Sequence, residues 1–171
     1  GSAGQMFFQQ SLGEDVDLEA VDPALIGFVR KMPVPSAFDA YPEFAGKRGT
    51  AAYRTTVTVA PGKAGILEFG GLGMWNRIYV DGVKIAETAM PYSGVSYRIE
   101  PSDATVHEVM IVSDNRFSPE RVPLQEQFFD FYAYGGIFRS VYWHEIGDLW
   151  IDRVHVTTVD LDRRELACAA I

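Results

Sequence analysis

The chain has 171 residues, of which 47% are apolar and 22% charged, so it can bury the core of one full domain and is too short for most two-domain enzymes. Its net charge of −8 would repel a phosphate backbone, which argues against nucleic acid as a partner. The single cysteine, Cys168, excludes an intrachain disulfide and a zinc site built on several thiolates. No apolar run approaches the roughly 18 to 20 residues that span a bilayer, so we expect a soluble chain without a membrane partner.

The first expected element lies in an acidic stretch, residues 13–24, which is either a loop or one short helix that starts at Asp22-Pro23. From Tyr53 onward, short runs rich in β-branched and aromatic residues are separated by Gly, Pro, Asp or Asn. This pattern predicts an all-β fold, an antiparallel sandwich or barrel. The predicted strands are residues 52–59, 65–69, 77–80, 83–87, 95–99, 107–113, 137–145 and 149–159, followed by a further strand-like run, 165–171.

Turn chemistry supports this division. Asp81-Gly82 offers two residues that tolerate positive φ, as a two-residue hairpin requires. Residues 60–63 and 101–103 carry the proline, glycine and aspartate that close turns. Residues 70–73 are rich in glycine but do not open a helix, so they predict a turn at a sheet edge and not a phosphate cradle.

The sequence offers little support for metal or cofactor chemistry. His107, His144 and His155 lie far apart inside predicted strands, and each is expected to be a partly exposed strand histidine. The chain lacks the spacing of zinc proteases, a nucleophile elbow, a phosphate loop and a dinucleotide fingerprint. We therefore expect no metal site and no cofactor.

Two carboxylates, Glu126 and Asp130, stand among aromatic residues near the end of a long loop-like stretch, residues 113–131. So long a loop in a compact domain is usually functional or mobile. Asp130 lies between Phe129 and Phe131, where aromatic faces could stack on a sugar and the carboxylate could accept its hydroxyl protons. A ligand role and a plain loop charge both remain open for Asp130 on these grounds, whereas for Glu126 a solvated loop charge is favoured.

The segment that follows has two further features. Gly135-Gly136 stands just before a predicted strand and permits a bend or bulge that a residue with a Cβ would resist. Arg139 shares a strand face with Ile137 in this scheme, and a guanidinium there needs a carboxylate or carbonyl partner, so its role is expected to be structural. Tyr53 and Tyr79 are expected to be core or interface aromatics, with sugar stacking as the minor alternative for each.

Five motifs, in order, resemble glycoside hydrolase family 2, above all its bacterial β-glucuronidases and β-galactosidases. Residues 129–142 resemble the stretch ending in "GGI-aromatic-R-D/S-V", and Asp130 to Ile137 is closer to the glucuronidase form "DFFNYAGI" than to the galactosidase form. The other four are Val34-Pro35-Ser36-Ala37-Phe38 for "VP-G/S-x-W/F", residues 52–57 for "WYRRTF", residues 67–71 for "LRFGGV" and residues 78–82 for "VWVNG".

The resemblance implies that residues 5–146 form the N-terminal jelly-roll sugar-binding domain of such an enzyme, and residues 147–171 the start of an immunoglobulin-like domain. Both catalytic glutamates would then lie in a (β/α)₈ barrel outside this chain, so the chain itself would have no catalytic residue. It would pack against these other domains, and its parent would be a homo-oligomer. Asp130 takes the position that in this family contacts the sugar on the non-reducing side of the cleaved bond.

Two alternatives remain open. The chain could be a self-sufficient carbohydrate-binding module, which should show a platform of exposed Trp or Tyr on one face, whereas Trp75, Trp143 and Trp150 are scattered over three segments. It could also be a purely structural or oligomerisation domain. Fold analogy alone does not choose among these functions.

Overall fold

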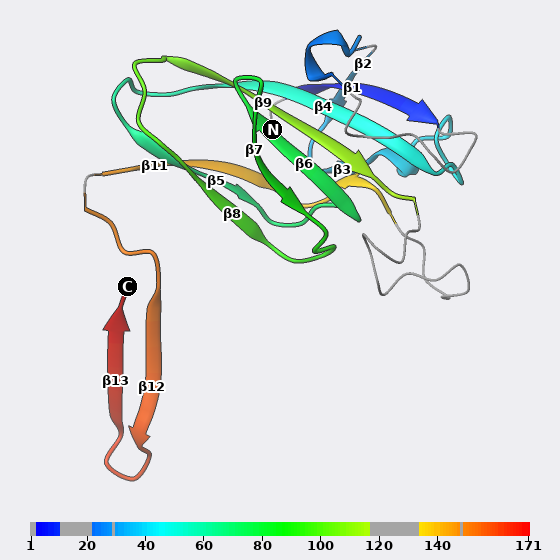
Figure 1. Ribbon diagram of the computed structural model, residues 1–171. Coiled ribbons are helices and arrows are strands. Elements are labelled where there is room, and N and C mark those ends of the chain that lie inside the picture. Colours follow the sequence, from blue (N-terminus) through cyan, green and yellow to red (C-terminus); the bar gives the residue numbers. More distant parts are fainter. Residues whose placement is uncertain (1–2, 11–21, 29, 117–133, 148) are drawn as a thin grey trace.

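The computed structural model describes residues 3–10, 22–28, 30–116, 134–147 and 149–171 (Figure 1). These residues form antiparallel β-strands and two short 3-10 helices, η2 (Pro23–Leu25) and η3 (Phe38–Ala40), with no α-helix among them. No helix in these ranges has the length and apolar character needed to cross a membrane. The predicted all-β class is therefore confirmed.

The larger sheet has six strands in the order β2-β1-β4-β9-β6-β7. Strand β4 is its longest member and pairs over its whole length with β9, from Thr50 opposite Asp114 to Thr58 opposite Val106. Strand β1 pairs with only the first part of β4, up to Gln5 opposite Arg54. The strands are β1 (Ala3–Gln10), β2 (Arg30–Pro33), β4 (Gly49–Thr58), β6 (Trp75–Val80), β7 (Val83–Thr88) and β9 (Val106–Asp114).

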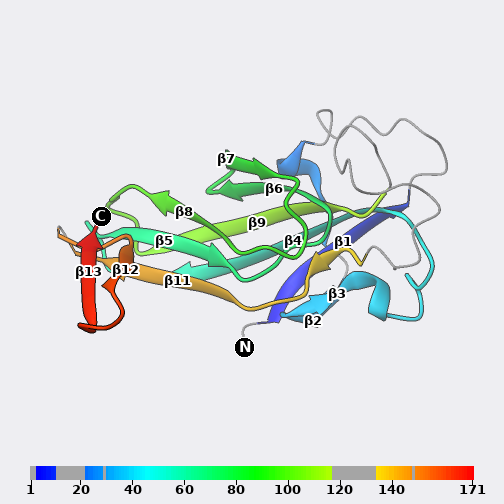
Figure 2. The same cartoon turned by 90° about the horizontal axis from the view of Figure 1, so that it is seen from below.

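A second sheet of three strands, in the order β11-β5-β8, packs against the larger one (Figures 1 and 2). Its strands are β5 (Ala64–Phe69), β8 (Val95–Ile99) and β11 (Val141–Ile146). Buried side chains of both sheets meet in one apolar cluster, which includes Leu67 and Phe69 from β5 and Ile78 and Ile111 from the larger sheet. The antiparallel β-sandwich is therefore confirmed, and Tyr53 lies within its core as expected.

Strand β6 is buried along its whole length because both faces of the larger sheet are covered. Ile78 and Val80 face the cluster between the sheets, while Trp75 and Tyr79 join a second cluster on the opposite face. Ile26 and Phe28 pack on that second cluster. The expected core role of Tyr79 is confirmed.

The predicted turns are present. Asp81 and Gly82 have φ of 50° and 76° and join β6 to β7 as a two-residue hairpin. Residues 60–63 turn between β4 and β5, and residues 70–73 lie at a sheet edge, where Leu72 bridges to Ile137. Asp22 begins a single 3-10 turn, because its Oδ1 accepts from Ala24 N at 2.9 Å. The remainder of the expected helix, before Asp22, lies outside the described residues.

The single strand predicted over residues 137–145 is wrong. The chain forms β10 (Gly136–Ile137), leaves the sheet, and forms β11 from Val141. The two parts pair with different partners, β10 with β3 (Ser36–Ala37) and β11 with β5. Strands β1, β2 and β3 were not expected from the sequence.

Strand β12 (Val154–Asp160) begins later than the predicted residue 149 and pairs only with β13 (Glu165–Ala170). This hairpin stands away from the sandwich (Figure 1). Its side chains are almost all exposed, among them Val156 and Leu166.

Candidate functional site

The chain segments on either side of residues 117–133 are held together at one end of the sandwich. Residues 113–116 close β9, and residues 134–136 lead into β10. Three buried polar side chains join them: Asp39, Ser113 and Asn115. We call these three residues the polar clamp.

Asp39 is the part of the clamp that binds the returning segment. It lies in η3 and is only 5% exposed. Its two carboxylate oxygens accept from Gly135 N at 3.3 and 3.2 Å, and Oδ2 also accepts from Asn115 Nδ2 at 3.1 Å. Burial raises the pKa of Asp39, and these donors only partly offset that effect. Ionisation of Asp39 is therefore less favourable in the folded chain than in the unfolded chain.

Asn115 binds the outgoing segment to the start of β4. It is fully buried, and its Oδ1 accepts from Gly49 N at 2.8 Å. Its Nδ2 donates to Asp39 and to Lys47 O, and its backbone N donates to Gly49 O at 3.2 Å. Every polar group of this side chain has a partner, which is the arrangement that makes a buried amide stabilising.

Ser113 completes the clamp beneath the glycine pair. Its Oγ accepts from Gly136 N at 3.0 Å and donates to Gly73 O at 3.4 Å. Gly136 has φ of 100°, and a Cβ at Gly135 would overlap the ring of Phe38. The predicted bend at Gly135-Gly136 is confirmed, and it requires residues without a Cβ.

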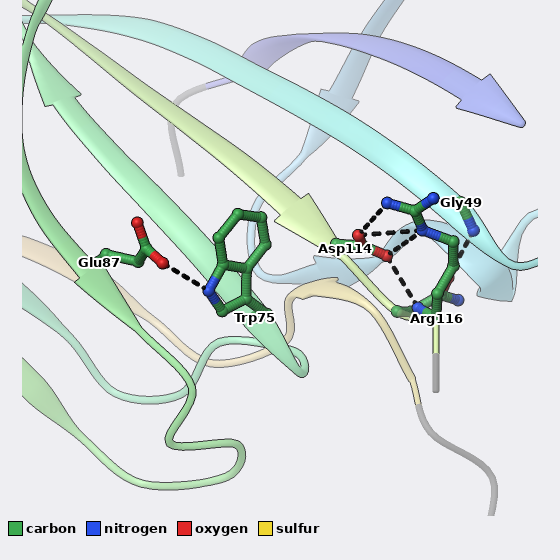
Figure 3. Close-up of polar contacts among 6 residues, drawn as sticks. Gly49, Trp75, Glu87, Asp114 and Arg116 are labelled. Atoms are coloured by element: carbon green, nitrogen blue, oxygen red, sulfur yellow. Dashed lines mark hydrogen bonds and ion pairs between the residues drawn. The ribbon is translucent and has the colours of Figure 1, made fainter. Parts of the chain in front are cut away.

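An ion pair fixes the last described residue before position 117. Arg116 Nη2 lies 2.6 Å from Asp114 Oδ2, and its Nε donates to both carboxylate oxygens at 3.0 Å (Figure 3). Arg116 N also donates to Asp114 Oδ1. The hydrogen bond with Asp114 raises the pKa of Arg116. This bidentate pair keeps the chain in one direction as it leaves β9.

Figure 3 also shows a polar contact on the neighbouring strands. Trp75 Nε1 donates to Glu87 Oε1 at 3.0 Å. In addition, Arg77 Nε lies 3.3 Å from Glu87 Oε2. The Arg77 guanidinium also lies over the Trp75 ring. This cluster satisfies a buried guanidinium and an indole N–H, so its role is structural.

The two carboxylates singled out from the sequence, Asp130 and Glu126, lie outside the described residues. Arg139 is described and exposed, and it does not share a strand with Ile137, which corrects that part of the prediction. Its Nη1 donates to Tyr92 O at 3.3 Å and to Gly70 O at 3.5 Å. The expected carbonyl partners and structural role are thus present.

The histidines differ from one another. His144 and His155 are exposed strand residues as expected, whereas His107 is buried, which contradicts the prediction. His107 Nδ1 lies 2.6 Å from Asp81 Oδ2, and its Nε2 lies 3.4 Å from Ser102 Oγ. The contacts run from serine to histidine to aspartate, as in the catalytic triad of serine hydrolases. Here, however, Ser102 Oγ accepts a hydrogen bond from Ala104 N and so stabilises a turn.

We therefore assign these contacts of His107 a structural role, the joining of two loops. Groups of three or more His, Cys, Asp and Glu side chains that could hold a metal ion are absent from the described part of the chain.

Sequence reasoning did not identify Asp39, Ser113 and Asn115. A signal was available for two of them, because Ser113-Asp114-Asn115 interrupts an apolar strand with three short polar residues. Such residues at the end of a buried strand typically bond to nearby backbone groups.

Comparisons with known proteins agree with this fold. No family model matches the chain. A provisionally named beta-glucuronidase of Formosa agariphila is 30% identical over 109 residues, which are 61% of this chain and 13% of that protein. Among solved structures, a GH2 beta-galacturonidase from Eisenbergiella tayi bound to galacturonate has a TM-score of 0.71 at 23% identity, over 91% of this chain and 25% of that one.

A beta-glucuronidase from an uncultured Clostridium species has a TM-score of 0.72 at 20% identity, over 95% of this chain and 32% of that one. A beta-glucuronidase from Ruminococcus gnavus in complex with uronic isofagomine has a TM-score of 0.71 at 20% identity, over 91% of this chain and 29% of that one. The chain thus spans a third or less of each of these relatives. The resemblance drawn from the five motifs is confirmed.

Proposed function

We propose that this chain is a non-catalytic domain of a family 2 glycoside hydrolase that acts on β-linked uronic acids. It holds residues 117–133, with Asp130, at the sugar subsite of a catalytic barrel. The relatives named above act, by their names, on glucuronides and galacturonides. The resemblance assigns both catalytic glutamates to a (β/α)₈ barrel, and the described residues are antiparallel strands.

The observation that carries the proposal is the polar clamp. It uses three buried polar side chains to hold the two ends of one segment, and the backbone of Gly135 and Gly136 supplies the bonded N–H groups. Burying polar groups is favourable only when they are fully bonded. This buried polar cluster supports a positioning role for the clamp, since the segment between its two ends contains Asp130 in the sequence.

The role proposed for Asp130 is to accept hydrogen bonds from sugar hydroxyls. A carboxylate is an acceptor only, with about four lone-pair sites, so it suits hydroxyl groups. It would repel the carboxylate of a uronic acid, so it contributes to recognition of the sugar ring and not of its acid group. Hydrogen bonds to charged groups contribute on the order of 1.5 to 3 kcal/mol.

The division into two domains is also a proposal. We assign residues 5–146 to the sandwich domain and residues 147–171 to the next domain, because strands β12 and β13 pair with each other and with no other described strand. Two strands rarely form a stable unit in water. Exposed Val156 and Leu166 on this hairpin fit an edge of the immunoglobulin-like domain that the resemblance implies.

The tryptophans favour this function over a self-sufficient binding module. Trp75 is buried, and Trp143 stacks on His107 at 5.3 Å between ring centroids. Two of the three tryptophans are thus not available for an exposed aromatic platform of the kind that such a module would use.

The test is steady-state kinetics of the full-length protein on an aryl β-glucuronide. Asp130→Ala is expected to lower kcat/KM by roughly 10- to 150-fold, since each 1.36 kcal/mol of lost transition-state stabilisation is about tenfold. Glu126→Gln serves as the matched control and should change kcat/KM less than about twofold. The melting temperature of both variants should stay unchanged, and residues 1–171 alone should show no turnover.

Unchanged kinetics of Asp130→Ala with a large fall in melting temperature would mean that Asp130 only stabilises its segment. Turnover by highly purified residues 1–171 would show that the chain carries its own catalytic pair. Either result would contradict the proposal.

A further inference from the structure

A groove of about 500 Å³ lies on the outer face of the three-stranded sheet. Its floor comes from β5, β8 and β11, and its wall from residues 150–152, which follow β11. Figure 1 shows the chain turning back beneath the end of this sheet after β11. The volume is within the range of small-molecule sites, roughly 300 to 1,000 Å³.

The register of the three strands sets the chemistry of the floor. Glu68 stands opposite Tyr142 on one side and opposite Ser96 on the other. His144 and Ile66 form the next row. The first row thus carries a carboxylate and hydroxyl groups, and the second places the apolar Ile66 between His144 and Arg98.

The Glu68 carboxylate keeps acceptor capacity for a ligand. Its Oε2 lies 2.8 Å from His144 Nε2, which fixes the side chain above the sheet. One such contact occupies one of about four lone-pair sites on the two oxygens. A ligand that donates several O–H groups could therefore bond to Glu68 and Ser96 together.

The wall supplies an aromatic surface. Trp150 is partly buried and lines the groove with Ile151 and Asp152. The Arg98 guanidinium lies 6.0 Å from the centre of the Trp150 ring. Aromatic rings of this size bind flat apolar faces while neighbouring polar groups fix orientation.

The charged side chains around the groove determine which hydroxyl-bearing ligands it favours. Two carboxylates, Glu68 and Asp152, line the groove. Arg98 is already paired with Glu100, with 3.1 Å between Nε and Oε1. The net charge of −8 adds a long-range repulsion of anions. The groove is therefore suited to a neutral ligand and not to a polyanion.

We propose that this groove binds a neutral pyranose unit of a saccharide chain, with the sugar face against Trp150 and its hydroxyls bonded to Glu68 and Ser96. The choice of a sugar rests on the proposed function, whereas its position and neutrality rest on the groove itself. This site would hold a carbohydrate chain on the domain without requiring its hydrolysis.

The experiment is a calorimetric titration of the protein with cellotetraose and xylotetraose, and with tetragalacturonate as the acidic comparison. We expect saturable binding of at least one neutral tetrasaccharide at millimolar concentration and weaker binding of the acidic one. Trp150→Ala should weaken binding about tenfold, and Glu68→Gln several-fold. Leu149→Ala is the matched control, because it removes an exposed neighbouring side chain that does not line the groove.

Circular dichroism of each variant checks that the sheet is intact, and Ser96→Val provides a second, smaller change in the floor. Absence of saturable binding, equal binding of the acidic tetrasaccharide, or normal binding by a folded Trp150→Ala would each overturn the groove proposal. These outcomes are separate from the test of Asp130. If Asp130→Ala lost turnover and Trp150→Ala still bound the neutral tetrasaccharide normally, the proposed function would stand and the groove proposal would be wrong.

Discussion

Replacing Asp39 by alanine should destabilise the fold and release one end of the segment 117–133. The change leaves Gly135 N and Asn115 Nδ2 without their acceptor in a buried place. Each unpaired buried donor costs about 1 to 3 kcal/mol. Part of this loss is offset, because the variant no longer buries a carboxylate, so we expect a net loss of about 2 to 4 kcal/mol.

The assay is urea unfolding at pH 7, combined with hydrogen exchange at the Gly135 amide. A loss of this size lowers the melting temperature of a chain of this length by about 4 to 16 °C. Asp39→Asn keeps one acceptor oxygen and should cost about half as much. Asp22→Ala is the control, because the exposed Asp22 bonds only to Ala24 N and should cost less than about 1 kcal/mol.

The sign of the pH dependence provides a second check. Burial raises the pKa of Asp39 in the folded state, so its stabilising contribution is greatest below its usual pKa and declines as pH rises through the raised value. The stability difference between the native protein and Asp39→Asn should therefore narrow with rising pH. An Asp39→Ala variant as stable as the native protein, with a protected Gly135 amide, would refute the clamp.

Three further outcomes are expected. Burial raises the pKa of Asp81, but hydrogen bonds from His107 and a backbone N–H outweigh it and lower the pKa below its usual value. Asp81→Asn should thus lower the free energy of unfolding by about 1 kcal/mol at pH 7. In urea unfolding, the difference between this variant and the native protein should vanish as pH falls through the lowered pKa. Gly135→Ala should prevent folding or expression through overlap with neighbouring side chains, whereas Gly62→Ala, at φ of 74° in open space, should cost only about 1 kcal/mol by the same unfolding assay. Amides of the hairpin 154–170 should exchange faster than those of the core strands when residues 1–171 are studied alone, and equal protection in a monomer would assign the hairpin to the sandwich.

The parts of the fold that could be predicted are those with a local physical cause. Asp81-Gly82 predicted its hairpin because two adjacent positive φ angles restrict the residue types. Strand β8 follows from alternation within five residues. The break after Ile137 could not be predicted, because it depends on the partner strands, which are β3 for β10 and β5 for β11.

The candidate site was predictable only in part. The family motif singled out Asp130, but the clamp joins Asp39 to Gly135 across 96 positions of the chain. Local periodicity carries no information about so distant a partner. The burial of His107 is a tertiary effect too, since Trp143 of another strand stacks on its ring.

The bonds of the clamp end on main-chain groups of Gly49, Gly135 and Gly136 and on side chains outside residues 117–133. These particular bonds therefore do not depend on which side chains stand between positions 116 and 134. A segment from a related enzyme grafted between Arg116 and Tyr134 should therefore leave these bonds of the sandwich in place. Under the proposed function, the sugar contact could thus change by exchange of residues 117–133, while the stability of the sandwich evolves separately.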